Sequence, residues 1–383
     1  MSGPLAGVRV VEMAGKGPGP FAAMLLADMG ADVVRIDRVG HSTVGSGPTG
    51  RGRRHVEVDL KQLEGVEFVL RLLSGADVLI EGFRPGTMER LGLGPDECLC
   101  RNERLVYARM TGWGQTGPLA HAAGHDINYV AIAGVLGSIG RRDAPPSVPL
   151  NLVGDYGGGA LYLVYGIMCS LFERTHSGKG QVVDAAMVDG AASLMTTFHW
   201  DRSVGRWSDQ RGTNRLDSGA FFYDVYETSD GGYMAVGCIE PKFYEEFRAV
   251  LGLVGPKWDS AQTDVASWPE RKEDLAALFR TRTRDEWCEV FDGVDACVTP
   301  VLALDEVSTH AHNRRRGLIR EFGDGLVPGV APRLSRTPGA VAARPEGGIG
   351  ELMPEWGTAV PKEVSPQVRV CRRADCCCRD ADR

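Results

Sequence analysis

The N-terminal half of the chain alternates short β-branched runs with helical segments, and this alternation restricts the fold more than any other feature. Such alternation is typical of a mainly parallel sheet with helices on its faces. We expect strands at residues 8–12, 32–36, 56–60, 78–80 and 105–110, and helices at residues 21–29 and 66–73. Ligands bind such sheets beyond the carboxyl ends of the strands. The loops that follow Met13, Ile36, Ile80 and Met110 are therefore expected on one binding edge.

The pattern changes near residue 216, which indicates a second domain of a different class. Alternating runs at residues 221–227 and 233–239 flank a Gly-containing turn and predict a β-hairpin. Helical segments follow at residues 241–251, 270–281 and 285–293, with a last one near 304–309.

We therefore predict an α/β fold with a large domain and a smaller α+β domain. The large domain covers residues 1–215, the small domain residues 216–312, and residues 313–350 return to the large domain. Residues 351–383 are rich in Pro, Arg and Cys without a period, so we expect an irregular, partly disordered tail.

Composition excludes several classes of function. With 383 residues, 43% of them hydrophobic, the chain is long enough to bury a large core in more than one domain. Its net charge of −7 gives no basic footprint, so no nucleic-acid binding is expected. The longest uncharged run, residues 156–172, is short for a bilayer, so no membrane span is expected. The ten cysteines form no disulfide framework and no zinc-type spacing, which predicts a reduced, intracellular protein without a metal site.

Two features of the first domain allow alternative interpretations. The Gly-rich turn after residue 13, with Asp37 after the second strand, resembles a dinucleotide fingerprint, but Pro20 stands where a third glycine belongs. Nicotinamide binding is thus a weak alternative. A local basic cluster follows, which predicts a cradle for phosphates and otherwise is a solvated loop. Its members are Arg35, Arg38, Arg51, Arg53, Arg54 and Lys61.

Two short segments carry the chemistry. His125 and Asp126 follow Gly124 ahead of an apolar run, and Asp155 follows Asn151 just before three glycines. A histidine and an aspartate on opposite sides of one carbon suit two-base proton exchange, in which one base removes a proton and the other returns it. The enolate intermediate would be held by backbone N–H groups at the Asp126 helix start.

Each of these residues also has a structural interpretation. The structural alternative for His125 is a satisfied position next to a helix cap, although a catalytic role is favoured. The alternative for Asp155 is the cap of a helix that begins at Tyr156, a position that is compatible with chemistry. Glu240 precedes Pro241, where an acid either caps the next helix or contributes to a site.

The motifs resemble those of the class III CoA-transferase family, and among its members those that racemise 2-methylacyl-CoA thioesters. The resemblance rests on residues 124–129, Asn151 with Asp155, residues 178–181 and residues 237–241. It extends over residues 8–300 and more loosely to 350. It implies a racemase that interconverts (2R)- and (2S)-2-methylacyl-CoA thioesters, such as branched fatty acyl-CoAs and bile-acid intermediates.

The resemblance also implies roles for individual residues. His125 would be the base on one face, helped by Glu240, and Asp155 the acid or base on the other, supported by Asn151. The amide of Asp126 would bind the thioester oxygen. CoA would be held by Arg38, Val58, Asp59, Leu60, Lys61, Arg84 and Arg90, and by Gly124, His125, Asp126, Ile127, Asn128 and Tyr129.

The family implies an interlocked homodimer with a large Rossmann-like domain and a small domain in each chain. The site would lie between the large domain of one subunit and the small domain of the other, which brings Glu240 to His125. No metal or redox cofactor is implied, because CoA is part of the substrate. Similar proteins occur in peroxisomes and mitochondria, whereas the final residues 381–383 are not an S-K-L-type signal and leave a cytosolic fraction open.

Three other functions remain open. A CoA transferase of the same fold would use Asp155 as a nucleophile but has no use for a second base. The others are the nicotinamide oxidoreductase and an inactive binding protein. In the latter, the Cys-rich tail replaces the regular helix that the family implies after residue 351, and this weakens the dimer.

Overall fold

The computed structural model describes residues 3–41, 47–341, 353–354, 356 and 368–370. It divides into two compact units. The first comprises Met1–Ala133, Leu150–Leu194 and Gly317–Arg383, and the second comprises Gly134–Pro149 and Met195–Arg316. The boundary expected at residue 215 thus lies inside the second unit. The physical reason is a contact between distant segments, since the Arg211 guanidinium donates to the carbonyl oxygens of Gly137 and Ala144.

The first unit is built on a seven-stranded sheet. In spatial order its strands are β12 (Val368–Val370), β3 (Arg53–Val58), β2 (Asp32–Asp37), β1 (Arg9–Met13), β4 (Val78–Glu81), β5 (Val106–Thr111) and β6 (Val182–Ala186). Pairing is parallel from β3 through β6, and β12 joins β3 antiparallel. The expected α/β class with a mainly parallel sheet is therefore confirmed.

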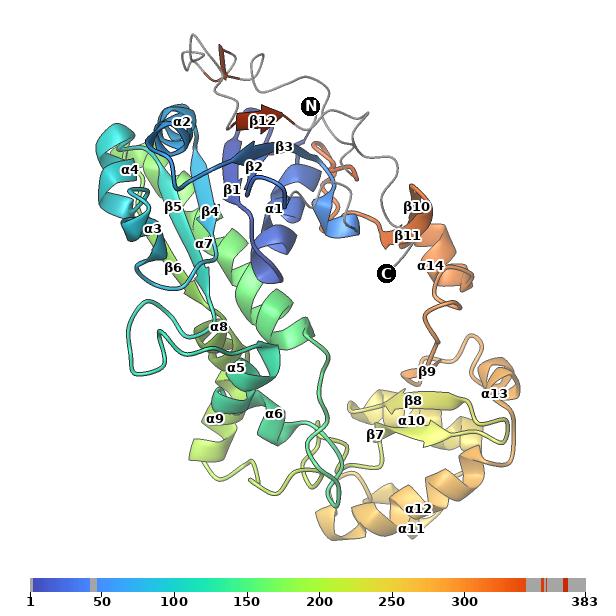
Figure 1. The fold of residues 1–383 in the computed structure, drawn as a ribbon. Helices are drawn as coiled ribbons and strands as arrows, with labels where there is room; N and C mark the ends of the chain where they lie inside the picture. Colours follow the sequence, from blue (N-terminus) through green and yellow to red (C-terminus); the bar gives the residue numbers. More distant parts are fainter. Residues whose placement is uncertain (1–2, 42–46, 342–352, 355, 357–367, 371–383) are drawn as a thin grey trace. The chain divides into compact units, whose positions relative to one another are not determined.

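Helices cover both faces of this sheet (Figure 1). One core lies beneath α2 (Leu63–Ser74), α3 (Thr87–Arg90) and α4 (Pro95–Arg101). The other lies beneath α1 (Pro18–Asp28), α5 (Asp126–Ile132), the π-helical segment η2 (Leu152–Leu161), α7 (Tyr162–Ser177) and α8 (Met187–Leu194). A short turn η1 (Pro48–Gly50) and a two-stranded ribbon of β10 (Ile319–Phe322) and β11 (Gly325–Pro328) complete the unit.

The prediction of an irregular tail is wrong for the part of it that the structure describes. Met353 and Trp356 are buried in the core beneath α2, and the Trp356 indole N–H donates to Asp32 at 2.9 Å. Residues 368–370 form β12 on the edge of the sheet. The rest of residues 351–383 lies outside the described residues.

Most of the basic cluster is a buried ion-pair network, so its predicted role as a phosphate cradle is wrong for four arginines. The Glu12 carboxylate forms ion pairs with the guanidinium groups of Arg35, at 2.8 Å, and Arg53, at 2.7 Å, inside the sheet. Arg51 pairs with Asp28, and Arg54 pairs with Asp32. Burial without these acids would be highly unfavourable, so the arginines serve the fold. Only Arg38 and Lys61 of the cluster are exposed.

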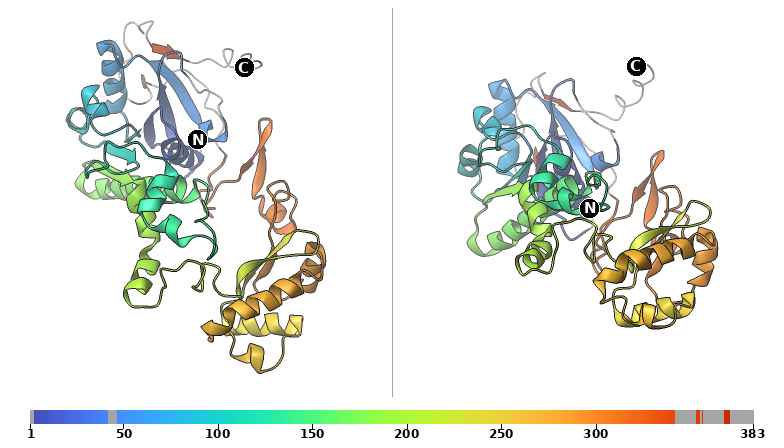
Figure 2. Two further views of the ribbon diagram at one scale, coloured as in Figure 1. Left: turned by 60° about the horizontal axis from the view of Figure 1, so that its bottom comes forward. Right: turned by 90° about the horizontal axis from the view of Figure 1, so that it is seen from below.

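The second unit contains a small antiparallel sheet, in the order β7 (Tyr223–Glu227), β8 (Tyr233–Gly237) and β9 (Val298–Pro300). Its longer helices gather beside this sheet (Figure 2). The helical segments are α6 (Val135–Ser138), α9 (Thr196–Ser203), α10 (Pro241–Leu251), α11 (Pro256–Asp259), η3 (Val265–Ser267), α12 (Trp268–Phe279), α13 (Arg284–Val290) and α14 (Ala311–Arg316). The core between them is rich in aromatic rings. The hairpin was predicted correctly, but residues 304–309 are turns where a helix was expected.

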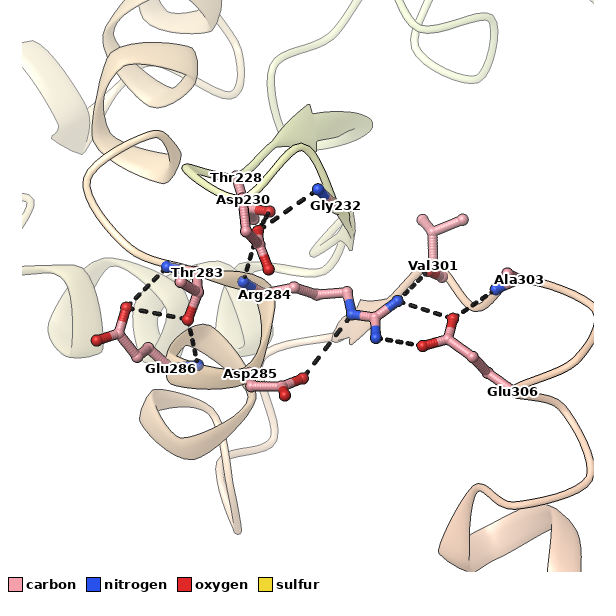
Figure 3. Close-up of polar contacts among 10 residues, drawn as sticks. All are labelled: Thr228, Asp230, Gly232, Thr283, Arg284, Asp285, Glu286, Val301, Ala303 and Glu306. Carbon is pink, nitrogen blue, oxygen red and sulfur yellow. Dashed lines mark hydrogen bonds and ion pairs between the residues drawn. The ribbon is translucent and has the colours of Figure 1, made fainter.

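Arg284 joins three segments of the second unit (Figure 3). Its backbone N–H donates to Asp230 in the β7–β8 turn at 3.1 Å. Its guanidinium donates to the Val301 carbonyl oxygen at 3.2 Å and to Glu306 at 2.9 Å. The Ala303 N–H also donates to Glu306, at 2.7 Å. The start of α13 thereby holds the chain that leaves β9.

Candidate active site

A cavity of about 490 Å³ lies at the carboxyl ends of β1, β4 and β5. Met13, Ile80 and Met110 line it, as expected from the end of each strand, whereas Ile36 does not. The other lining residues that matter below are Lys16, Phe83, Arg84, Trp113, Gly124, His125, Asn128, Tyr129 and Met187. The first unit alone supplies this cavity.

His125 occupies the N-cap position of α5 and is exposed beside the cavity. Its backbone N–H donates to the Asn128 side chain at 3.0 Å, which fixes the entry of the helix. The Tyr129 hydroxyl donates to the Gly124 carbonyl oxygen, and its ring packs edge-on against Trp113 at 4.8 Å. These contacts orient the backbone of His125, which is one of the residues that line the cavity.

Gly112 and Gly124 are required for that arrangement. A Cβ added at Gly112 would lie 2.1 Å from the Tyr129 ring, and one at Gly124 would lie 2.8 Å from the same ring. Glycine is therefore required at both positions because the Tyr129 ring lies so close to them.

Asp155 lies within the π-helical segment η2, whose N-cap position is Asn151. The interpretation of Asp155 as the cap of a helix starting at Tyr156 is therefore wrong. The Asn151 amide donates to Asp155 Oδ2 at 3.0 Å, which supports the orienting role expected for Asn151. A Cβ added at Gly17, in the loop after β1, would lie 3.1 Å from the same oxygen. The carboxylate therefore adjoins the loop that borders the cavity.

Asp126 connects the two motifs. Its Oδ1 accepts a hydrogen bond from the Asp155 N–H at 2.7 Å, although the residues lie far apart in sequence. Gly154 permits this approach, since an added Cβ there would lie 2.4 Å from Asp126 Oδ1. Burial is the largest cause that raises the pKa of Asp126, and the charge of Asp155 raises it further, against the effect of two backbone N–H groups. The side chain next to His125 thus holds the backbone of Asp155.

The expected CoA-binding residues fall into two groups. Arg84, Gly124, His125, Asn128 and Tyr129 line the cavity. The other expected residues do not line it. Arg38, Lys61 and Ile127 are exposed, Leu60 is half-buried, and Val58 and Asp126 are buried. The Asp59 side chain accepts a hydrogen bond from the Lys61 N–H, and the Arg90 guanidinium donates one to Thr87.

Glu240 belongs to the second unit, where it occupies the N-cap position of α10 and is exposed. The structural interpretation as a capping acid is correct for its position only, because its side chain makes no capping hydrogen bond. Its expected partner His125 belongs to the first unit.

Lys16, Phe83 and Trp113 are among the cavity residues that sequence reasoning missed. Each follows the carboxyl end of a strand of the parallel sheet, at β1, β4 and β5. The rule that places ligands at these ends was sufficient to identify them.

Within the described part of the chain, His, Cys, Asp and Glu side chains form no group suited to a metal ion. Across the same residues, no helix is long and apolar enough to cross a bilayer.

Comparisons with known proteins agree on one family. The model described as CoA-transferase family III matches residues 5–350. Alpha-methylacyl-CoA racemase of Mus musculus is 49% identical over 348 residues, covering 91% of both chains. Alpha-methylacyl-CoA racemase of Homo sapiens is 47% identical over 358 residues, covering 92% of this chain and 93% of the human protein. A solved CAIB/BAIF family protein from Brucella suis matches with a TM-score of 0.77 at 25% identity, covering 91% of this chain and 97% of that one.

Proposed function

This chain belongs to CoA-transferase family III, and we propose that within this family it is a racemase of 2-methylacyl-CoA thioesters. The observation that carries the proposal is the hydrogen bond from the Asp155 N–H to Asp126, which unites the His125 and Asp155 motifs in one unit. The relatives named as racemases, at 49% and 47% identity, support the same reaction.

The proposed reaction moves a proton from one face of carbon 2 to the other. Either His125 or Asp155 removes the proton, and the conjugate acid of the other returns one on the opposite face. The intermediate is an enolate, whose oxygen is held by the Asp126 N–H at the start of α5. Asn151 orients the Asp155 carboxylate through its amide.

A transferase that uses Asp155 as a nucleophile is the alternative. His125 disfavours it, because acyl transfer through an aspartyl anhydride has no use for a second base. His125 lies beside the cavity, and Asn128 fixes its backbone. This position suits a general acid or base.

The proposed CoA site uses cations at the carboxyl edge of the sheet. Arg84 lines the cavity, and Arg38 and Lys61 are exposed after β2 and β3. Phosphate oxygens suit these side chains, while Arg90, residues 58–60 and residues 124–129 would contact the rest of CoA. The proposed reaction uses only side chains and backbone groups of the protein and the CoA of the substrate, so it includes no further cofactor.

We further propose that the active protein is a homodimer. One face of α7 and the turn before it is apolar and exposed, with residues at the helical spacings of four, three and four. These residues and their exposed fractions are Leu161 53%, Tyr165 67%, Met168 37% and Phe172 70%. A contiguous apolar stripe of this kind marks a protein contact. A second copy would cover the stripe and present its Glu240 to His125.

The proposed compartment is the peroxisome or the mitochondrion, from the resemblance to the racemases. Co-localisation of the tagged full chain with peroxisomal and mitochondrial markers tests this proposal. A purely cytosolic signal would contradict it.

The function is tested by incubating the full chain with a resolved 2-methylacyl-CoA in heavy water. The racemase predicts deuterium at carbon 2 together with loss of optical purity, both followed by NMR. Intact stereochemistry, with CoA passed to an added carboxylate acceptor, would establish the transferase instead.

A further inference from the structure

The link between β8 and α10 is held by the side chain of a glutamine from another segment of the second unit. The Gln262 amide donates to the Cys238 carbonyl oxygen at 2.9 Å and to the Ile239 carbonyl oxygen at 3.1 Å. Its NH₂ group thus binds the two carbonyl oxygens that immediately precede Glu240. Gln262 thereby fixes the backbone that leads into the residue expected to assist His125.

The segment that carries Gln262 is anchored independently of this link. The Trp268 indole N–H donates to the carbonyl oxygen of Ala261, the preceding residue, at 3.1 Å, and both residues are buried. On the other side, the Thr263 hydroxyl donates to the Ser260 carbonyl oxygen at 3.0 Å. Gln262 itself is half-buried. Its amide therefore acts on the link from a fixed position.

The backbone around Glu240 is engaged in hydrogen bonds, whereas its carboxylate points away from the helix end. The Ile239 N–H donates to the Gly237 carbonyl oxygen at 2.9 Å. The Glu240 carbonyl oxygen accepts from the N–H groups of Phe243, at 3.1 Å, and Tyr244, at 3.0 Å. The Glu240 side chain is exposed and makes no capping hydrogen bond. A fixed backbone with an exposed carboxylate suits a group that acts outside its own unit.

We propose that Gln262 is a positioning residue for Glu240, because it holds the link so that the carboxylate keeps one orientation. The inference rests on the proposed function, in which Glu240 of one copy assists His125 of the other. Without the amide, both carbonyl oxygens would turn to water and the link would gain conformational freedom. The carboxylate would then spend less time in the productive orientation, which lowers turnover without changing the binding of CoA.

The experiment is a double-mutant cycle on racemisation, with Gln262→Met, Glu240→Ala and the combined variant. Methionine is similar in size to glutamine but cannot donate a hydrogen bond. We expect Gln262→Met to lower kcat by about tenfold and to leave KM unchanged, because a misplaced group affects the transition state more than substrate binding. In the Glu240→Ala background, Gln262→Met should cause no further loss, because the group that it positions is absent.

Gln210→Met is the matched control, because it makes the same replacement at an exposed glutamine of the same unit. It should leave both kcat and KM unchanged. If Gln262→Met folds poorly, Gln262→Glu takes its place in the cycle, since an ionised carboxylate has nearly the shape of the amide and donates no hydrogen bond.

Two outcomes would overturn the inference. An unchanged kcat in Gln262→Met would show that its hydrogen bonds do not position Glu240. An equal loss of kcat with and without the Glu240 carboxylate would show that Gln262 acts only through the stability of the second unit.

Failure of the proposed function is distinguishable from failure of the inference. If the wild type racemises no thioester, the proposed function fails, and amide hydrogen exchange then tests the inference. Exchange in residues 238–244, followed by mass spectrometry, should be faster in Gln262→Met than in the wild type if Gln262 holds the link. Equal exchange in the two proteins would overturn the inference as well.

Discussion

At the scale of single residues, the separation of the two proposed bases depends on the side chain between them. Asp126 follows His125 in sequence and accepts a hydrogen bond from the Asp155 N–H at 2.7 Å. The positions of the imidazole and the carboxylate are therefore coupled through one hydrogen bond. Gly154 and Gly17 leave the room that this geometry needs.

Replacing Asp126 by alanine should slow the reaction strongly. The Asp155 N–H would lose its acceptor, which destabilises the fold by about 1–3 kcal/mol. A displacement of the carboxylate by about 1 Å lowers turnover on the order of 10²-fold. Turnover and affinity for the thioester, measured separately, should show a fall in kcat with little change in affinity.

Asp126→Asn is the matched control, because its carbonyl oxygen can accept the same hydrogen bond. It should retain most of the activity that Asp126→Ala loses. Equal losses in the two variants would show that the hydrogen bond to Asp155 does not position the carboxylate.

At the scale of elements, the site depends on the contact between η2 and α8. A Cβ added at Gly190 would lie 1.8 Å from the Gly158 carbonyl oxygen, and one at Gly158 would lie 2.5 Å from the backbone N of Ala191. Two backbones meet here without side chains between them. This contact holds the segment that carries Asp155 against α8.

Gly190→Ala should destabilise the first unit, because the added methyl group overlaps backbone atoms that no rotamer change relieves. Overpacking of this kind destabilises by about 1–3 kcal/mol or more. The midpoint of urea unfolding should fall accordingly. In Gly50→Ala the methyl group meets nothing within 4 Å, so the effect should stay within about 0.5 kcal/mol. Similar midpoints for the two variants would contradict the account.

The Arg284–Glu306 contact predicts a pH dependence for the second unit. The hydrogen bond from Arg284, aided by the Ala303 N–H, lowers the pKa of Glu306 from 4.5 to about 2. Because the folded pKa is lowered, ionised Glu306 stabilises the fold above its unfolded pKa near 4.5, and this stabilisation is lost as the pH falls toward 2.

Urea unfolding of the wild type and Glu306→Gln tests this dependence. Their difference in unfolding free energy should be constant at neutral pH and shrink as the pH falls below 4.5. The same substitution in an Arg284→Met background should show a weaker trend, because the guanidinium that lowers the pKa of Glu306 is absent. A difference between wild type and Glu306→Gln that does not vary with pH would refute the assigned pKa.

At the scale of the whole molecule, the exposed stripe on α7 predicts the oligomeric state. Tyr165→Glu or Phe172→Glu would place a charge in the proposed contact, where an unpaired charge is unfavourable. We expect the wild type to sediment as a dimer, and either variant as a monomer with strongly reduced activity. Glu173→Gln, an exposed neighbour outside the stripe, should remain dimeric and active. A monomeric, fully active wild type would exclude the proposed dimer.

Much of the large unit could be predicted from sequence because its strands are signalled locally. The β-branched runs at β1, β2, β3, β4 and β5 were recognisable in isolation. By contrast, β6 and β12 were missed. β12 has only three residues, and β6 has only two β-branched residues, Val182 and Val183, ahead of an aspartate and two alanines. The motifs of His125 and Asp155 were likewise local.

Features that depend on distant partners could not be predicted. Arg51 and Arg54 looked like phosphate ligands because their acids, Asp28 and Asp32, lie on other elements. The hydrogen bond between Asp126 and Asp155 joins α5 to η2, and it depends on how these two helical segments pack. Sequence spacing carries no record of such contacts.

The central claim is that two different residues serve the two faces of carbon 2. The most direct test follows exchange in heavy water for each pure epimer separately, with His125→Ala and Asp155→Ala. Each variant should stop racemisation but still exchange the proton of one epimer without inversion, and the two variants should act on opposite epimers. A variant that still racemises, or two variants that act on the same epimer, would contradict the two-base account.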